Sequence, residues 1–175
     1  ELRVAHDAVD ASRELILRAM EDGRPHYGIN TGFGILANER IGAEQLTELQ
    51  QNILLSHACG VGDPVPPDIT RLMLQLKIHA LGLGQSGISK TTFRQLLALE
   101  ASGIVSWVPS RGSVGASGDL APLAHLCLPL IGSGEVWNGD FSGKEDADRA
   151  MRRLGLAPIA LQAKDGLALI NGTQL

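Results

Sequence analysis

The feature that most constrains this fold is the recurrence of apolar residues at helical spacing in several stretches of the chain. Within residues 4–20 apolar side chains return every three or four positions, and Gly23-Arg24-Pro25 is expected to end that helix. The same spacing predicts helices over residues 43–58, 68–83, 89–101, 119–131 and 145–154. Loops rich in glycine and proline separate these stretches. The pattern therefore predicts a mainly α fold, in which loops connect buried helices.

The apolar stripes that define two of these helices, and so their expected core faces, can be stated residue by residue. The first helix has the stripe Val4, Ala8, Ala11, Leu15 and Ala19. The helix over residues 68–83 has the stripe Ile69, Leu72, Met73, Leu76, Ala80 and Leu83. Residues 119–131 are apolar nearly all round, so that helix should be fully buried. Residues 104–108 are expected to be extended, with Pro109 opening a loop, and Asn138-Gly139 predicts one small β-hairpin at residues 135–141.

Composition and charge exclude several classes of protein. The chain has 175 residues, enough to bury a core, and one compact unit is the simplest expectation. Its net charge is -4 with scattered Lys and Arg residues, so nothing predicts binding to nucleic acid. No apolar run approaches the roughly 20 residues of a membrane helix, and no HExxH or Cys/His cluster predicts a metal site. Cys59 and Cys127 stand in apolar surroundings, which predicts buried, reduced thiols and a cytoplasmic protein.

The two ends of the chain predict that it is part of a longer protein. The sequence begins at Glu1 without an initiator methionine and ends at Leu175 inside an apolar segment. Natural termini more often run out into polar, poorly ordered residues.

Residues 112–119 (GSVGASGD) form a loop that admits three interpretations. The simplest is a flexible connector capped by Asp119. The second is a phosphate site at a helix N-terminus, although the spacing fits neither GxGxxG nor GxxxxGK[ST]. In the third, the loop itself reacts: the amide nitrogen of Gly118 closes a ring onto the carbonyl carbon of Ala116. Dehydration that removes the Ser117 hydroxyl then leaves an exocyclic methylidene, which is a strong electrophile.

Each residue type in this third interpretation has a chemical reason. Gly118 has no side chain to obstruct its nitrogen and reaches backbone angles that other residues avoid. Ala116 is small enough for a compressed turn, and Ser117 supplies the leaving group. The adjoining helix N-terminus would stabilise negative charge that arrives on the ring.

Four blocks of sequence resemble the aromatic amino acid ammonia-lyases, the histidine/phenylalanine ammonia-lyase family. GSVGASGDLAPLAHL at 112–126 is similar to the family signature. YGINTGFG at 27–34, LSHACGVG at 55–62 and AKDGLALINGTQ at 163–174 resemble its other blocks, in the family's order. The resemblance covers nearly the whole chain. It implies the N-terminal helical domain of the fumarase/aspartase-like architecture, with residues 1–175 as a single domain fragment that lacks the parent's C-terminal helical region.

The resemblance also implies a prosthetic group and a reaction. The group is 4-methylideneimidazol-5-one (MIO), formed autocatalytically from Ala116, Ser117 and Gly118, with no metal and no nucleotide. The reaction is non-oxidative deamination, in which ammonia and a β-hydrogen leave an aromatic L-amino acid. An electrophile eases removal of the weakly acidic β-hydrogen by capturing substrate electrons through the amino group or through the ring, and both routes stay open.

Ser56-His57 resembles the pair of histidine-specific members, which makes the conversion of L-histidine to urocanate and ammonia the expected reaction. The alternatives are a tyrosine or phenylalanine ammonia-lyase and an aminomutase, which returns ammonia to the β-carbon. A different class of alternative is an inactive fragment or a non-enzymatic binding module.

Four individual residues receive roles from the resemblance, each with a plainer alternative. Tyr27 corresponds to the base that removes the β-proton, and otherwise is a packing anchor. His57 corresponds to the contact for the substrate imidazole, and otherwise is a core histidine. Asn171 corresponds to the asparagine beside the prosthetic group, and otherwise is a helix N-cap. Asp119 is expected to cap its helix and to support ring closure by hydrogen-bonding the bent loop.

Members of the family are longer and form homotetramers whose active sites combine several subunits. A second catalytic tyrosine, an arginine for the substrate carboxylate and an acidic residue near the amino group are expected beyond Leu175. The 175 residues alone are therefore expected to lack appreciable activity, to expose apolar surface and to associate.

Overall fold

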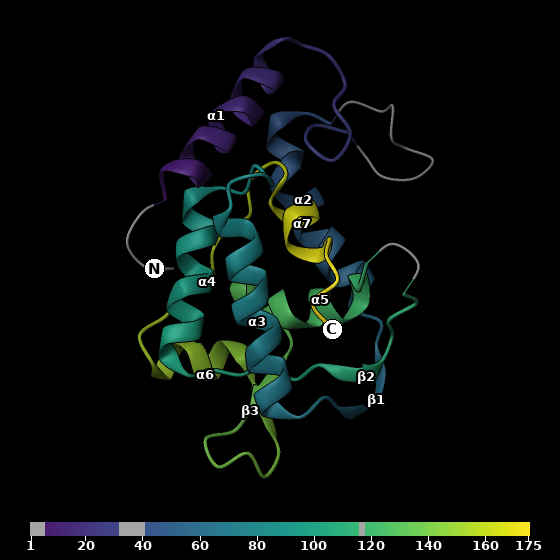
Figure 1. The fold of residues 1–175 in the computed structure, drawn as a ribbon, viewed down its shortest axis with the longest axis vertical. Coiled ribbons are helices and arrows are strands. Elements are labelled where there is room, and N and C mark those ends of the chain that lie inside the picture. Colours follow the sequence, from purple (N-terminus) through teal and green to yellow (C-terminus); the bar gives the residue numbers. More distant parts are fainter. Residues whose placement is uncertain (1–5, 32–40, 116–117) are drawn as a thin grey trace.

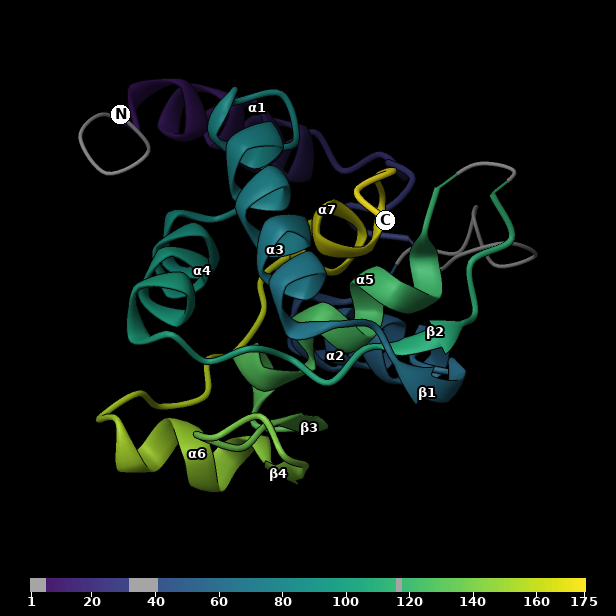
Figure 2. The ribbon, with the colours of Figure 1, turned by 60° about the horizontal axis from the view of Figure 1, so that its bottom comes forward.

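The computed structural model describes residues 6–31, 41–115 and 118–175, and Figures 1 and 2 show how they are arranged. Within this part the α-helices are α1 (Asp7–Glu21), α2 (Ala43–His57), α3 (Pro67–Gly82), α4 (Lys90–Ser102), α5 (Leu120–Cys127), α6 (Ala147–Arg153) and α7 (Asp165–Ile170). The strands are β1 (Val61–Pro64), β2 (Pro109–Arg111), β3 (Glu135–Trp137) and β4 (Lys144–Asp146). This architecture confirms the expected mainly α fold.

Helix α5 forms the centre of the core. It packs against α2 and α7, while α3 and α4 lie side by side and α1 packs across both (Figure 2). Its residues Ala121, Pro122, Leu123, Ala124, Leu126 and Cys127 are buried, which confirms the prediction for this apolar stretch. After Cys127 the chain tightens into a 3-10 helix, η2 (Leu128–Ile131), because Pro129 has no amide hydrogen to continue the α-helical pattern.

The stripe predicted for α1 does not face the core. Val9, Ser12 and Arg13 are buried instead, and Leu15 is 64% exposed. Arg13 is drawn inward because its guanidinium donates hydrogen bonds to the carbonyl oxygens of Gly87, at 3.1 Å, and Ala163, at 2.7 Å. Val4 lies outside the described residues.

The stripe predicted for α3 is also largely on the wrong side. Met73 is buried as expected, but most of the stripe is exposed, namely Ile69, Leu72, Leu76 and Leu83. The face that packs into the core consists of Thr70, Met73, Leu74, Lys77, Ile78 and Leu81. Because α3 carries apolar residues on two sides, its periodicity could not determine which side has a partner.

The strands form two small antiparallel pairs. β1 pairs with β2, so Pro109, predicted to open a loop, instead begins a strand whose partner lies far back in the sequence. β3 pairs with β4, which confirms a hairpin after Glu135 but moves its second strand to Lys144. The side chain of Asn138 holds the connecting loop by accepting hydrogen bonds from the amides of Ser142 and Gly143.

Buried Asp165 fixes the start of α7 against the start of α4. Its carboxylate accepts hydrogen bonds from the amide and hydroxyl of Ser89, at 2.7 and 2.8 Å, and from the Thr92 hydroxyl, at 2.7 Å. The Gln162 amide donates a further bond, at 2.8 Å. Ser89 also caps α4, because its side chain accepts a hydrogen bond from the Thr92 amide.

The two cysteines differ in exposure. Both are free thiols; Cys127 is buried in α5, and burial raises the pKa of its thiol to about 12. Cys59 is exposed, contrary to the prediction, because it lies in the loop that follows the end of α2.

Candidate active site

The C-terminal end of the 112–119 loop, at Gly118 and Asp119, lies against the segment that follows α7. The amide of Asp119 donates a hydrogen bond to the carbonyl oxygen of Gly172, at 2.7 Å. Gly118 has a φ of 121°, and a Cβ atom there would lie 2.9 Å from the same oxygen and 3.5 Å from Oδ1 of Asn171. The predicted prosthetic tripeptide is therefore described at Gly118, beside Asn171, whereas Ala116 and Ser117 lie outside the described residues.

Asp119 occupies the N-cap position of α5, but it makes no capping hydrogen bond with its side chain. That part of the prediction is wrong, because the buried carboxylate is engaged elsewhere. Oδ1 accepts a hydrogen bond from the Ser113 hydroxyl, at 2.6 Å, and Oδ2 accepts one from the Leu175 amide, at 3.1 Å. The side chain thus joins the beginning of the loop to its end, and both to the chain after α7.

Asn171 ends α7 as its C-cap, with extended backbone angles, and no helix follows it in the described residues. The alternative of an N-cap is therefore wrong. The main-chain amide of Asn171 donates a hydrogen bond to the Leu167 carbonyl oxygen, at 3.1 Å. Its main-chain carbonyl oxygen accepts a hydrogen bond from Nζ of Lys77, at 2.7 Å. The main chain that carries Asn171 is consequently held from both sides.

Lys77 was not predicted as a site residue. It is 1% exposed on the inner face of α3, and burial lowers the pKa of its ammonium from 10.5 to about 8. The available sequence signal was a lysine between Leu76 and Ile78 in the middle of an apolar helix. A long, flexible lysine in that setting more often reaches solvent, so only the fold reveals the contact with Asn171.

Tyr27 lies in the turn after α1 and is 57% exposed. Its neighbour Gly28 has a φ of 71°, and a Cβ atom at that position would come 2.3 Å from Cδ2 of Leu167. The tight contact brings the main chain beside Tyr27 against α7, four residues before Asn171. The rest of the predicted block, residues 32–34, lies outside the described residues.

His57 ends α2 with its ring orientation fixed by the helix. Its Nδ1 lies 2.8 Å from the Ile53 carbonyl oxygen and 3.2 Å from Oγ of Ser56. A carbonyl oxygen only accepts hydrogen bonds, so Nδ1 carries the hydrogen and Nε2 is the acceptor of the neutral ring.

Contacts of Gly60, just after α2, join the region of His57 to the 112–119 loop and to α5. The Gly60 amide donates to Nε2 of His125 on α5, at 3.1 Å, and a Cβ atom at Gly112 would lie 3.1 Å from Cα of Gly60. Burial lowers the pKa of His125, which favours the neutral ring that accepts this bond. No role was predicted for His125 from the sequence. In the structure its hydrogen bond with Gly60 links the segment after α2 to α5.

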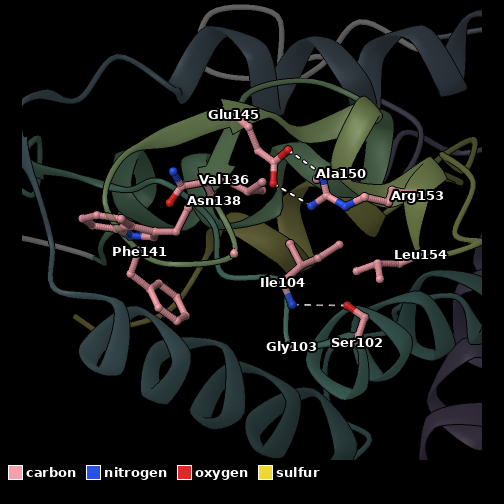
Figure 3. A pocket seen from close by; sticks show the side chains of 12 residues that line it. Ser102, Gly103, Ile104, Val136, Asn138, Phe141, Glu145, Ala150, Arg153 and Leu154 are labelled. Carbon is pink, nitrogen blue, oxygen red and sulfur yellow. Dashed lines mark hydrogen bonds and ion pairs between the residues drawn. The ribbon is translucent and has the colours of Figure 1, made fainter.

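The cavity in Figure 3 lies in another part of the molecule. It has a volume of about 210 Å³, and its lining includes Ile104, Trp137 and Phe141. Glu145 and Arg153 form a doubly hydrogen-bonded ion pair at its edge, with distances of 2.7 and 2.8 Å. None of the described residues predicted for the site lines this cavity, so the loop and α7 define the candidate site.

The described residues also fit a ring at positions 116–118. Both the φ of Gly118 and its closeness to Gly172 require a residue without a side chain, which is also what ring closure through its nitrogen needs. The N-terminus of α5 follows directly, where partial positive charge favours a developing anion. Among the described residues no group of three His, Cys, Asp or Glu side chains could hold a metal ion, and no helix is long and apolar enough to cross a membrane.

Known proteins share both the sequence and the fold. The histidine ammonia-lyase of Salmonella arizonae is 49% identical over 171 residues, which are 97% of this chain and 33% of that protein. That of Anaeromyxobacter dehalogenans is 51% identical over 175 residues, 97% of this chain and 34% of that protein. The chain thus spans about a third of the length of these relatives.

Solved structures agree with this similarity. Histidine ammonia-lyase from Trypanosoma cruzi superimposes with a TM-score of 0.87 at 41% identity, covering 96% of this chain and 32% of that one. Tyrosine aminomutase from Streptomyces globisporus superimposes with a TM-score of 0.88 at 32% identity, covering 98% of this chain and 32% of that one. The family model for aromatic amino acid lyases matches residues 3–175. With the sequence blocks, the fold and the family model in agreement, the chain belongs to the aromatic amino acid lyase family.

Proposed function

We propose that the protein containing this chain is a histidine ammonia-lyase, which converts L-histidine to urocanate and ammonia. The observation that carries the proposal is the contact between Gly118 and the Asn171-Gly172 main chain, in a chain about half identical to histidine ammonia-lyases. Ala116, Ser117 and Gly118 would form MIO. When formed, MIO supplies an electrophile that takes up substrate electrons and makes the β-hydrogen removable.

The residues of this chain then have distinct tasks. Tyr27 accepts the proton from the β-carbon. Nε2 of His57, left as an acceptor by the bond from Nδ1 to Ile53, accepts a hydrogen bond from the substrate imidazole. The Asn171 amide hydrogen-bonds the prosthetic group or the substrate amino group. Asp119 keeps the loop bent through Ser113 and Leu175.

Substrate choice can be tested with the whole protein. Purified enzyme is given L-histidine, L-tyrosine and L-phenylalanine, the products are identified, and its intact mass is measured. We expect urocanate from L-histidine and a mass lower by two water molecules. His57→Leu should raise KM for L-histidine about tenfold, the effect of one lost hydrogen bond. His79→Leu, at an exposed histidine of α3, is the control and should leave KM unchanged.

Other products would overturn the proposal in different ways. A β-amino acid would identify an aminomutase, the candidate favoured by the structural similarity to tyrosine aminomutase. Preference for tyrosine or phenylalanine would identify a lyase with other specificity. A full-length protein with neither turnover nor loss of water would be a binding module.

We further propose that residues 1–175 are a single N-terminal domain of a cytoplasmic homotetramer. The length of the relatives, about three times that of this chain, supports a longer parent protein. Light scattering of the whole protein should give the mass of four subunits, and a monomer would contradict the proposal.

A further inference from the structure

The ammonium group of Lys77 is buried in the core, where few polar groups replace its hydration. The side chain is 1% exposed on the face of α3 that also buries Met73, Ile78 and Leu81. An ammonium removed from water is strongly disfavoured unless polar groups replace its hydration. The ion pairs formed among the described residues do not include Lys77. Its hydrogen bond goes to the carbonyl oxygen of Asn171, 94 residues further along the chain.

The carbonyl that Lys77 binds controls the geometry of the candidate site. Asn171 is the C-cap of α7, and the last carbonyl groups of a helix have no partner within it. A cation at this end also complements the helix dipole. Fixing the Asn171 carbonyl fixes the peptide plane between Asn171 and Gly172. The carbonyl oxygen of Gly172 accepts a hydrogen bond from the Asp119 amide. Both Gly172 and the side chain of Asn171 lie beside Gly118.

We propose that Lys77 is a positioning residue for this site: its ammonium holds the Asn171-Gly172 main chain so that the Asn171 side-chain amide and Gly118 keep their relative placement. The proposal rests on the proposed function of that loop. A charged donor makes the stronger hydrogen bond, which gives a reason for a lysine at a position that an apolar residue would fill more readily. Nearby Cys127 stays a neutral thiol, because burial raises its pKa to about 12.

The test uses the whole protein and three variants. Lys77→Met keeps the length and apolar stem of the side chain but removes the donor, and Lys77→Arg restores a charged donor. Leu74→Ala, at a buried residue of the same helix, is the control for destabilisation alone. For each protein the melting temperature, kcat and KM are measured. The mature fraction is the fraction of chains whose intact mass has fallen by two waters, and kcat is expressed per mature chain.

We expect Lys77→Met to keep or raise the melting temperature, because a buried ammonium is removed. Its mature fraction, its kcat per mature chain, or both should fall about tenfold with KM changed less than about threefold, the loss expected for one hydrogen bond to a charged group. Lys77→Arg should recover most of that loss. Leu74→Ala should lower the melting temperature without lowering kcat per mature chain.

The contrary results are equally definite. If Lys77→Met matures fully and keeps its kcat, or if Lys77→Arg recovers nothing, Lys77 does not position the site. An equal loss of mature fraction or of kcat in Leu74→Ala would reduce Lys77 to a general structural role. If the wild-type protein itself neither loses water nor turns over an amino acid, the proposed function fails, and the Lys77 proposal fails with it.

Discussion

The carboxylate of Asp119 illustrates how a single residue holds two segments that are distant in sequence. It accepts one hydrogen bond from Ser113, at the beginning of the 112–119 loop, and one from Leu175, after α7. A carboxylate with two acceptor oxygens can make both bonds at once, whereas a hydroxyl or an amide of similar size offers fewer acceptor sites. The residue predicted as a helix cap is therefore better described as a connector of the loop.

Replacing Asp119 should impair ring formation. In Asp119→Ala the loop loses the bonds that bend it, so we expect at least about a tenfold smaller mature fraction, in line with two lost hydrogen bonds. Intact-mass analysis of the whole protein measures this fraction. Ser113→Ala, which removes one of the two bonds, should have a smaller effect. Full maturation of Asp119→Ala would show that the loop bends without this residue.

The pKa of Lys77 predicts how stability depends on pH. Below pH 8 both folded and unfolded chains carry the charge, and the unfavourable burial of the ammonium is present in full. Between about pH 8 and 10.5 the folded protein has lost this proton while the unfolded chain retains it, so stability rises with pH through that window. The gain is on the order of 3 kcal/mol and ends above the unfolded pKa.

Melting temperatures from pH 7 to 10.5 measure this effect in the whole protein. The comparison is wild type minus Lys77→Met, because other groups also titrate in the window. The melting temperature of the wild type should rise relative to that of Lys77→Met as the pH increases. Lys90→Met, at a partly exposed lysine paired with Asp10, should show no such change relative to wild type. A constant difference for Lys77→Met would contradict the shifted pKa.

At the scale of elements, a short helix carries the asparagine of the site. Helix α7 has 6 residues, too few to be stable by itself, so its position depends on what holds its ends. Asp165 ties its beginning to α4, and Lys77 holds its last carbonyl from α3. The Gly166 amide donates to Oε1 of Gln50 on α2, at 2.8 Å.

Loss of the Asp165 carboxylate should therefore separate α7 from α4. Asp165→Ala leaves the buried hydroxyl donors of Ser89 and Thr92 without their acceptor and removes the negative charge that offsets the buried guanidinium of Arg13. We expect a loss of roughly 3–5 kcal/mol in unfolding free energy, as for other broken buried charge networks.

Urea unfolding of the whole protein measures the loss. Asp10→Ala removes a carboxylate from a partly exposed ion pair with Lys90, so it should cost less than about 1 kcal/mol and serves as the control. Equal effects of the two substitutions would show that Asp165 is not the tie between the helices.

At the scale of the whole molecule, the outward face of α3 is an apolar stripe. Its members are between 43% and 58% exposed and follow helical spacing, namely Ile69, Leu72, Leu76 and Leu83. Contiguous apolar patches of this kind are uncommon on monomeric proteins and usually mark a covered surface. The relatives are about three times as long as this chain, so the stripe has further protein available to cover it.

The isolated 175 residues should consequently associate through this stripe. We expect light scattering to give a mass above that of the 18.5 kDa monomer, and Leu72→Glu with Leu76→Glu to restore the monomer. Leu15→Glu, at an exposed leucine of α1 outside the stripe, should change nothing. A monomeric wild-type segment would contradict this prediction. The same segment should show no lyase activity.

The sequence by itself predicted the described α-helices other than α7 and the order of the family blocks, and it supplied the candidate site residues at 27, 57, 118, 119 and 171. Local spacing sets a helix because its hydrogen bonds join neighbours in the sequence, and Ser89 or Gly23 act on adjacent residues. The ring closure proposed for Ala116-Ser117-Gly118 likewise involves three consecutive residues.

Only the tertiary structure decided which face of α1 and α3 packs, that Pro109 enters a strand, and what Asp119 and Lys77 contact. Each of these depends on a partner that lies far away in the sequence: Leu175 for Asp119, Asn171 for Lys77, Val61–Pro64 for β2. A helix with apolar residues on both sides has no local preference between them, and a buried lysine is defined by the carbonyl it reaches. Long-range packing supplies that information, because burial and hydrogen bonding are properties of the folded neighbourhood.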